Sequence, residues 1–149
     1  MTGWRLGYAA LPEALVEPVT RLIVNSVSCT PPAVQLAGVA ALTGPWDAVE
    51  AMRGEFRRRR DTIVAGLGRL PGVTCALPRG AFYAFPNVTG TGLRAKELAD
   101  RLLDEAGVAV LSGTSFGRHG DGHLRISYAS SLDNLEQAVE RIRGFVTAL

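Results

Sequence analysis

The sequence predicts an α/β fold in which a short sheet packs against several helices. Three observations indicate this class. Strand-type segments alternate with helix-type segments, glycine and proline mark the boundaries between them, and the apolar content of 47% is that of an ordinary globular core. A strand that leads into a helix, as in the first part of the chain, suits an α/β layer.

The first half of the chain predicts one short strand and three helices. Apolar and small residues at 4–10 predict the strand, and Pro-Glu at 12–13 begins a helix whose apolar positions recur at helical spacing. The polar stretch 25–32 ends that helix, and its two prolines are placed to start the next one. Across 46–70 apolar residues recur at intervals of three, four or seven, which predicts one long amphipathic helix.

The second half predicts a small sheet with two further helices. β-type runs occupy 73–76, 80–85, 108–111 and 123–128, and we expect the first two to be adjacent strands. A helix over 93–106 ends at a glycine, and a near capping box at 130–133 begins the last helix. The side chains expected to face the core are Leu98, Leu102, Leu103 and Ala106 in the first of these helices and Leu135, Ala138, Val139, Ile142 and Val146 in the second.

Composition excludes several classes of function. The net charge of +2 is too small to argue for nucleic acid, and the run Arg57–Arg60 spreads around a helix as a solvated collar. No apolar run approaches the roughly 20 residues that span a bilayer, and the opening residues do not resemble the basic-then-apolar pattern of a signal peptide. We therefore expect a soluble cytoplasmic protein that binds neither nucleic acid nor membrane.

Metal binding and disulfide formation are not expected either. His119 and His123 lie four residues apart, but the neighbourhood adds only Asp121 as a further ligand. Cys29 and Cys75 are far apart in sequence and lack the spacing of a metal site. Both cysteines are therefore expected to be reduced thiols.

Arg5 is the first candidate binding residue, because it lies between Gly3 and Gly7 at the start of an apolar segment. A guanidinium stays charged, and its planar fork of donors suits a phosphate or carboxylate better than a lysine does. The chemistry alone leaves both anions open, as well as a surface arginine that opens a strand.

Arg125 is the second candidate. Strand alternation places Leu124 and Ile126 on one face of the predicted strand and Arg125 on the other. Its guanidinium is then either an exposed strand charge or the partner of an anion. A bidentate pair with a carboxylate fixes orientation, and each charge-assisted hydrogen bond is worth roughly 1.5–3 kcal/mol.

Four segments, taken together, resemble fold-type I, pyridoxal-phosphate-dependent aminotransferases of class I and II, especially the bacterial aspartate-aminotransferase-like group. They occur in family order: Met-Thr-Gly-Trp-Arg-Leu-Gly-Tyr at 1–8, Gly-Ala-Phe-Tyr at 80–83, Ser-Phe-Gly at 115–117 and Leu-Arg-Ile-Ser-Tyr-Ala at 124–129. The resemblance implies the C-terminal part of the pyridoxal-phosphate-dependent transferase fold. Residues 1–45 would be a remnant of the large cofactor domain, 46–70 the linking helix and 71–149 the small C-terminal domain.

The resemblance also implies roles for individual residues. Arg5 would bind the phosphate of pyridoxal 5'-phosphate, and Arg125 would pair with the substrate's α-carboxylate. Gly80 and Phe82 would line the substrate pocket, although Phe82 also suits ordinary β packing. The family's Schiff-base lysine precedes the opening methionine, and the only lysine here, Lys96, is expected on a solvated helix face. We therefore assign no catalytic residue within this chain.

The implied activity is transfer of an amino group from an amino acid to a 2-oxo acid, in a homodimeric enzyme of which this chain is a C-terminal fragment, inactive alone. One alternative is a pyridoxal-phosphate-dependent β-lyase of the same fold. Another is a truncated, non-catalytic module that folds and self-associates. In either case we expect exposed apolar surface over residues 1–45.

Overall fold

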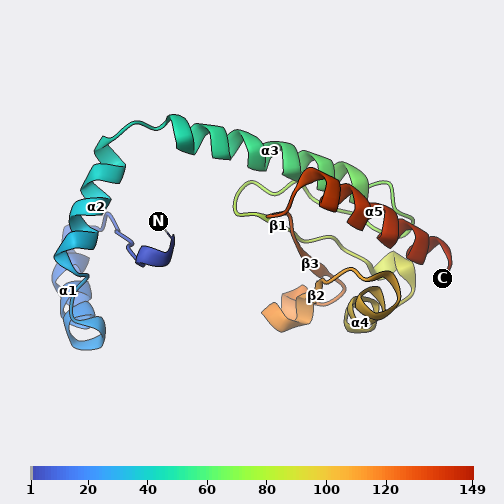
Figure 1. Cartoon of the computed structure of the whole chain (residues 1–149). Helices are drawn as coiled ribbons and strands as arrows, with labels where there is room; N and C mark the ends of the chain where they lie inside the picture. The colour runs from blue at the N-terminus through green and yellow to red at the C-terminus, as the bar shows by residue number, and fades with distance from the viewer. Residues whose placement is uncertain (1) are drawn as a thin grey trace. The chain divides into compact units, whose positions relative to one another are not determined.

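The computed structural model describes residues 2–149. They form two compact units, one up to Ala48 and the other from Val49 to Leu149. The N-terminal unit holds the 3-10 turn η1 (Thr2–Trp4) and the helices α1 (Glu13–Val27) and α2 (Pro32–Thr43) (Figure 1). The long helix α3 (Asp47–Leu67) begins at the end of this unit and runs into the C-terminal unit.

Proline positions account for both helices of the N-terminal unit. Pro12 precedes α1, and Pro32 occupies the first turn of α2, where a missing N–H costs nothing. The strand predicted at 4–10 is wrong, because the chain there is irregular after η1. A strand needs a neighbour to complete its hydrogen bonds, and the other regular elements described in this unit are helical.

The sheet of the C-terminal unit is short and antiparallel. Its strands β1 (Tyr83–Ala84), β2 (Leu111–Ser112) and β3 (Leu124–Ser127) have the order β1-β3-β2. In place of the longer strands predicted at 80–85 and 108–111, the structure has only the two-residue strands β1 and β2. The run 73–76 contributes a single bridge from Thr74 to Asn87. One reason is that Ala81 adopts φ 58°, in the left-handed region, which ends extended backbone just before β1.

Both predicted helices of this unit are present, as α4 (Ala95–Ala106) and α5 (Leu132–Thr147). Gly107 ends α4 with φ 64°, and the Ser131 side chain accepts a hydrogen bond from the Asn134 N–H at the start of α5. The inward orientation predicted for Leu103 is wrong, because 54% of this side chain is exposed. The buried face of α4 is formed by Ala95, Leu98, Ala99 and Leu102.

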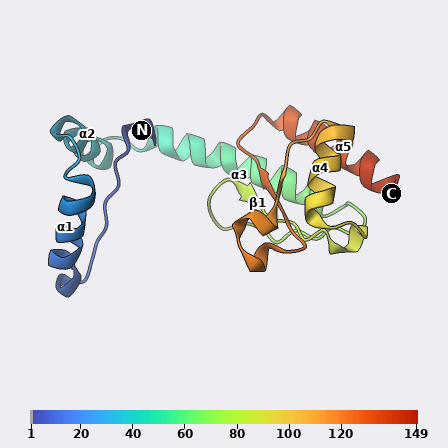
Figure 2. The same ribbon diagram turned by 90° about the horizontal axis from the view of Figure 1, so that it is seen from below.

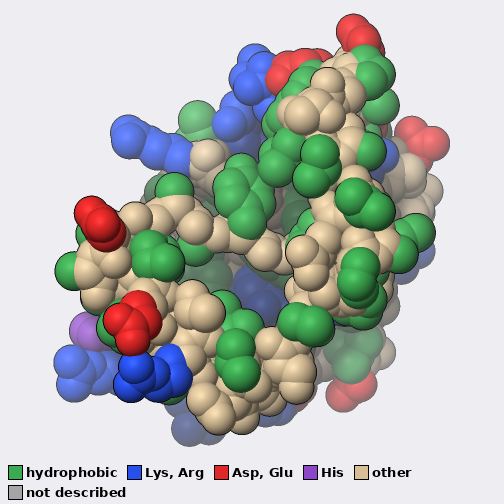
Figure 3. All heavy atoms as spheres, turned by 90° about the vertical axis from the view of Figure 1, so that its left-hand side faces the viewer, with side chains coloured by type: hydrophobic (Ala, Val, Ile, Leu, Met, Phe, Trp, Pro, Cys, Tyr) green, Lys and Arg blue, Asp and Glu red, His purple; other side chains and the backbone are tan. Residues whose placement is uncertain are grey.

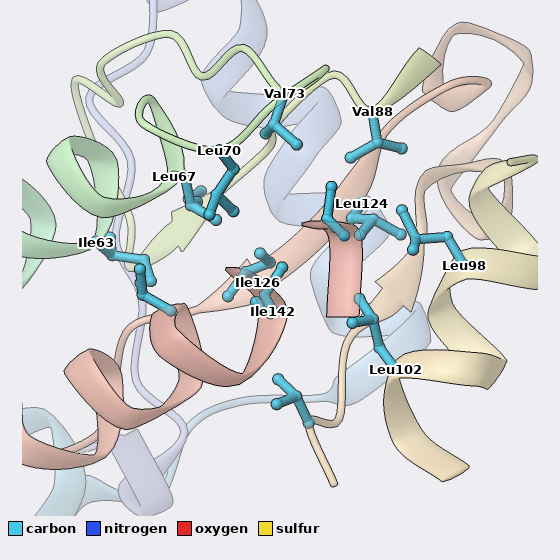
Figure 4. Close-up of a cluster of buried hydrophobic side chains, with 14 of the residues drawn as sticks. Ile63, Leu67, Leu70, Val73, Val88, Leu98, Leu102, Leu124, Ile126 and Ile142 are labelled. Carbon is cyan, nitrogen blue, oxygen red and sulfur yellow. The ribbon is translucent and has the colours of Figure 1, made fainter. Parts of the chain in front are cut away.

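The core lies between one face of the sheet and the three helices α3, α4 and α5 (Figures 1 and 2). Gly66 lets α3 approach α5 closely, since a Cβ there would stand 2.8 Å from both methyl groups of Val139. Figure 4 shows the core side chains pointing toward one another: Ile63, Leu67, Leu70, Val73, Val88, Leu98, Leu102, Leu124, Ile126 and Ile142.

The helices of the N-terminal unit leave most of their apolar side chains exposed. α1 has no buried residue, and α2 buries only Gly38, against which Leu6 packs. Figure 3 shows hydrophobic side chains spread over the face that it turns toward the viewer. Even so, none of the helices within 2–149 has both the length and the hydropathy to cross a bilayer.

Candidate functional site

Arg125 lies at the centre of the sheet face that points away from the core. Its neighbours Leu124 and Ile126 are buried, whereas Arg125 is half-buried on the opposite face, as strand alternation predicts. Tyr83 shares that face, because it lies opposite Ser127, two residues along β3 from Arg125. The register of two very short strands thus places an aromatic ring beside the guanidinium.

The Arg125 guanidinium contacts the rings of two aromatic residues. Its Cζ lies 4.4 Å from the ring centroid of Tyr83 and 4.1 Å from that of Phe116. Such a cation–π contact contributes about 0.5–2 kcal/mol, depending on how far it is desolvated. These contacts use none of the hydrogen-bonding capacity of the guanidinium, so its N–H groups stay available to an anion.

Phe116 comes from the 3-10 turn η3 (Gly113–Phe116) that follows β2. Gly113 anchors this turn, because its N–H donates to the His123 carbonyl at 2.7 Å and its Cα packs against the backbone of Gly120. Any side chain at Gly113 would collide with that backbone. Close glycine packing therefore brings η3 alongside β3 and fixes the position of the Phe116 ring.

The Arg125 charge has no ion-pair partner among residues 2–149. We call the set of Arg125, Tyr83 and Phe116 the arginine clamp. An unpaired guanidinium, fixed in place and half-buried, is the arrangement that binds a carboxylate through two parallel hydrogen bonds.

Phe82 and Gly80 lie on the turn that leads into β1. The Phe82 ring is 40% exposed and lies 4.6 Å from the Tyr83 ring of the arginine clamp, measured between centroids. The turn is held by Tyr128, whose hydroxyl donates to the Ala81 carbonyl at 3.0 Å and whose N–H donates to the Phe82 carbonyl at 2.9 Å. Burial raises the pKa of the Tyr128 hydroxyl above its ordinary value, which keeps it a donor.

Arg5 belongs to the N-terminal unit, where it is exposed and adopts φ 53° in irregular backbone. The two candidate guanidinium groups, those of Arg5 and Arg125, therefore lie in separate units. Its only amine-bearing side chain, Lys96, is exposed on α4 and paired with Asp100. These residues fit the phosphate of pyridoxal phosphate and a substrate carboxylate, but Lys96 does not fit the role of the cofactor's amine.

Tyr83 and Phe116 are the residues that sequence reasoning missed. Period-two alternation places Tyr83 on the face of Arg125 only once the strand pairing is known. Nothing in the glycine-rich loop around Phe116 indicated that its ring would reach Arg125.

A family model and the sequences of known proteins point to the same family. The sequence model of class I and II aminotransferases matches residues 1–142. The chain is 42% identical over 144 residues to an aspartate aminotransferase of Pyrococcus horikoshii and 44% identical over 153 residues to one of Geobacillus stearothermophilus. These alignments cover 95% and 99% of this chain.

Solved structures agree with the sequence matches. An aromatic aminotransferase from Pyrococcus horikoshii superposes with a TM-score of 0.91 at 39% identity, over 99% of this chain and 40% of its own. An aspartate aminotransferase from Thermus thermophilus with maleate gives 0.85 at 38% identity, over 100% of this chain and 38% of its own. The chain spans only 37–38% of the length of the two curated relatives above. It belongs to the class I and II aminotransferase family.

Proposed function

We propose that this chain forms the substrate-carboxylate and cofactor-phosphate part of a pyridoxal-phosphate-dependent aminotransferase, which moves an amino group from an amino acid to a 2-oxo acid. The observation that supports this most directly is the arginine clamp. A guanidinium that contacts the rings of Tyr83 and Phe116, and that pairs with none of the carboxylates between residues 2 and 149, is prepared for the α-carboxylate that every amino acid and 2-oxo acid carries.

The proposed roles follow from each residue's chemistry. Arg125 binds the α-carboxylate bidentately, while the two rings of the clamp stop its side chain from swinging away. Phe82 and Gly80 wall the substrate pocket beside the clamp, and Arg5 binds the cofactor phosphate. Pyridoxal phosphate, when bound, supplies the electron sink that lets the amino acid lose its α-proton.

We extend the proposal to the organisation of the protein. Residues 1–45 belong to a large cofactor domain, 46–70 link it to a small domain, and 71–149 form that small domain. The exposed apolar side chains of α1 and α2 support association into a homodimer. The free thiols of Cys29 and Cys75 fit the reducing cytoplasm.

A chimera tests the proposed function. In the aspartate aminotransferase of Geobacillus stearothermophilus, the segment that aligns with this chain is replaced by residues 1–149, so that the relative supplies the rest of the enzyme. We expect transfer of the amino group from aspartate to a 2-oxo acid. Competitive inhibition by maleate should accompany it, since maleate carries two carboxylates.

Variants of the chimera assign the activity to the clamp. Arg125→Gln should lower kcat/KM about 30- to 5,000-fold, because truncating one partner of a close charge pair costs about 2–5 kcal/mol. Arg118→Gln, on an exposed 3-10 turn, removes the same charge and should change kcat/KM less than twofold. A folded chimera without activity would favour the non-catalytic module, and equal losses in both variants would remove Arg125 from its proposed role.

A further inference from the structure

Four arginines surround a groove of about 270 Å³ on the C-terminal unit. Three of them, Arg53, Arg57 and Arg60, come from α3, and Arg79 comes from the turn before β1. We call this the arginine groove. Its remaining lining residues are Phe56, Pro78, Gly80, Ala81 and Tyr128.

The groove forms because helix periodicity and one turn bring the four side chains together. Positions 53, 57 and 60 are separated by four and three residues, so their side chains share one face of α3. The turn that carries Arg79 is fixed by the Tyr128 hydroxyl on the Ala81 carbonyl. A long contact of 3.5 Å from Arg60 Nη1 to the Pro78 carbonyl joins the helix to the turn.

The run Arg57–Arg60 therefore does not behave as a uniform solvated collar. Arg58 and Arg59 both pair with Glu55, whose pKa is lowered by hydrogen bonds from these two guanidinium groups. Arg57 and Arg60 turn instead into the groove. Two arginines of the run thus belong to an ion-pair cluster around Glu55, and the other two belong to a surface with positive charge.

That positive charge is only partly neutralised. Arg53 pairs with Glu50 and Arg60 with Asp61, at 2.5 and 2.7 Å between N and O. Arg57 and Arg79 form no ion pair with a residue in the described part of the chain. Neither carboxylate lines the groove itself. Guanidinium groups gathered in one hollow repel one another unless an anion lies between them.

We propose that the arginine groove binds a small anion that carries two or more phosphate groups. Guanidinium forks reach it from a helix and from a turn, and tetrahedral phosphates offer oxygens in several directions, whereas a planar carboxylate engages one fork. The groove goes beyond the proposed function, because no member of the arginine clamp lines it. Gly80 is the one residue it shares with the proposed substrate pocket.

Calorimetric titration of the 149-residue chain with pyrophosphate, at constant ionic strength, tests the proposal. We expect saturable binding of one pyrophosphate per chain. The double variant Arg57→Gln/Arg79→Gln should weaken it at least tenfold. The matched control Arg69→Gln/Arg94→Gln removes two exposed arginines that do not line the groove, and should change affinity less than twofold.

Further measurements distinguish a specific binding site from non-specific electrostatic attraction. Arg57→Lys/Arg79→Lys keeps the charge but loses the forks, so its affinity should fall between wild type and the glutamine variant. Citrate should bind at least fivefold more weakly than pyrophosphate. Circular dichroism melts confirm that each variant is folded. The proposal is overturned by absence of saturable binding, by equal weakening in the control, by full affinity in the lysine variant, or by equal affinity for citrate.

Discussion

The two units of the chain bury their apolar side chains to different extents. In the C-terminal unit, a sheet and three helices enclose a shared core from Ile63 to Val146. In the N-terminal unit, two apolar helices bury only Gly38. Two helices leave most of each helix surface uncovered, whereas layers on several sides exclude water. The pattern of apolar residues therefore specifies helices in both units, but a complete core forms only in the C-terminal unit.

Helix α3 shows the same contrast within one element. Val49 and Met52, near its start, are exposed, whereas Ile63 and Leu67, near its end, are buried. The amphipathic pattern is continuous along the helix, so the difference arises from what packs against each part. The predictions below use pairs of matched positions to test this contrast.

The largest expected effect is on the oligomeric state. The whole chain should self-associate as its concentration rises, because the exposed apolar side chains of α1 and α2 are stabilised when a second copy covers them. A chain restricted to residues 49–149 should remain monomeric. Light scattering after size-exclusion chromatography measures both. A whole chain that stays monomeric at high concentration would contradict the contrast between the units.

Truncating one leucine in each unit compares their packing. Leu102→Ala should lower the free energy of unfolding by about 2–5 kcal/mol, since Leu102 is fully buried and its removal leaves a cavity. Leu22→Ala, in α1, should change it by less than about 0.5 kcal/mol at a protein concentration where the chain is monomeric, because Leu22 is then exposed. Urea denaturation followed by circular dichroism gives both values, and similar losses would show that α1 is buried in solution.

Two glycines of α3 should respond to alanine with opposite signs. At Gly66 the new methyl group meets Val139, and overpacking costs about 1–3 kcal/mol, which outweighs the gain in helix propensity. At Gly54 no atom lies within 4 Å, so alanine should stabilise the helix by up to about 1 kcal/mol. Thermal unfolding of both variants checks the sign. Stabilisation by Gly66→Ala would show that α3 and α5 are less closely packed.

The smallest expected effect concerns the Tyr128 hydroxyl. Tyr128→Phe removes its hydrogen bond to Ala81 and should cost about 1 kcal/mol at neutral pH. Folding raises the pKa of Tyr128 above its ordinary value of 10.0. The stability that the neutral hydroxyl contributes to the folded protein is therefore complete below pH 10 and is lost as pH rises through the higher folded pKa. Urea denaturation between pH 8 and pH 11 should show a steeper loss in wild type than in the variant. Equal slopes would mean that the hydroxyl is solvated.

Much of the candidate site depended on more than sequence. Strand alternation correctly placed Arg125 on the face away from the core, because that pattern is a property of three neighbouring residues. The contacts of Tyr83 and Phe116 with its guanidinium could not be predicted, since they require both the β1–β3 register and the approach of η3. The roles of Arg5, Gly80 and Phe82 rest on the family resemblance and stay predictions.

The sequence by itself determined the five helices to within a few residues and the family of the chain. Its signals for helices are local: prolines at their starts, Gly107 at an end, Ser131 as a cap, and apolar periodicity between them. Tertiary structure alone decided that the segment 4–10 is not a strand, that Leu103 faces water, and that four arginines share a groove. Each of these outcomes depends on contacts between segments far apart in sequence, and local pattern carries no information about which partner will be present.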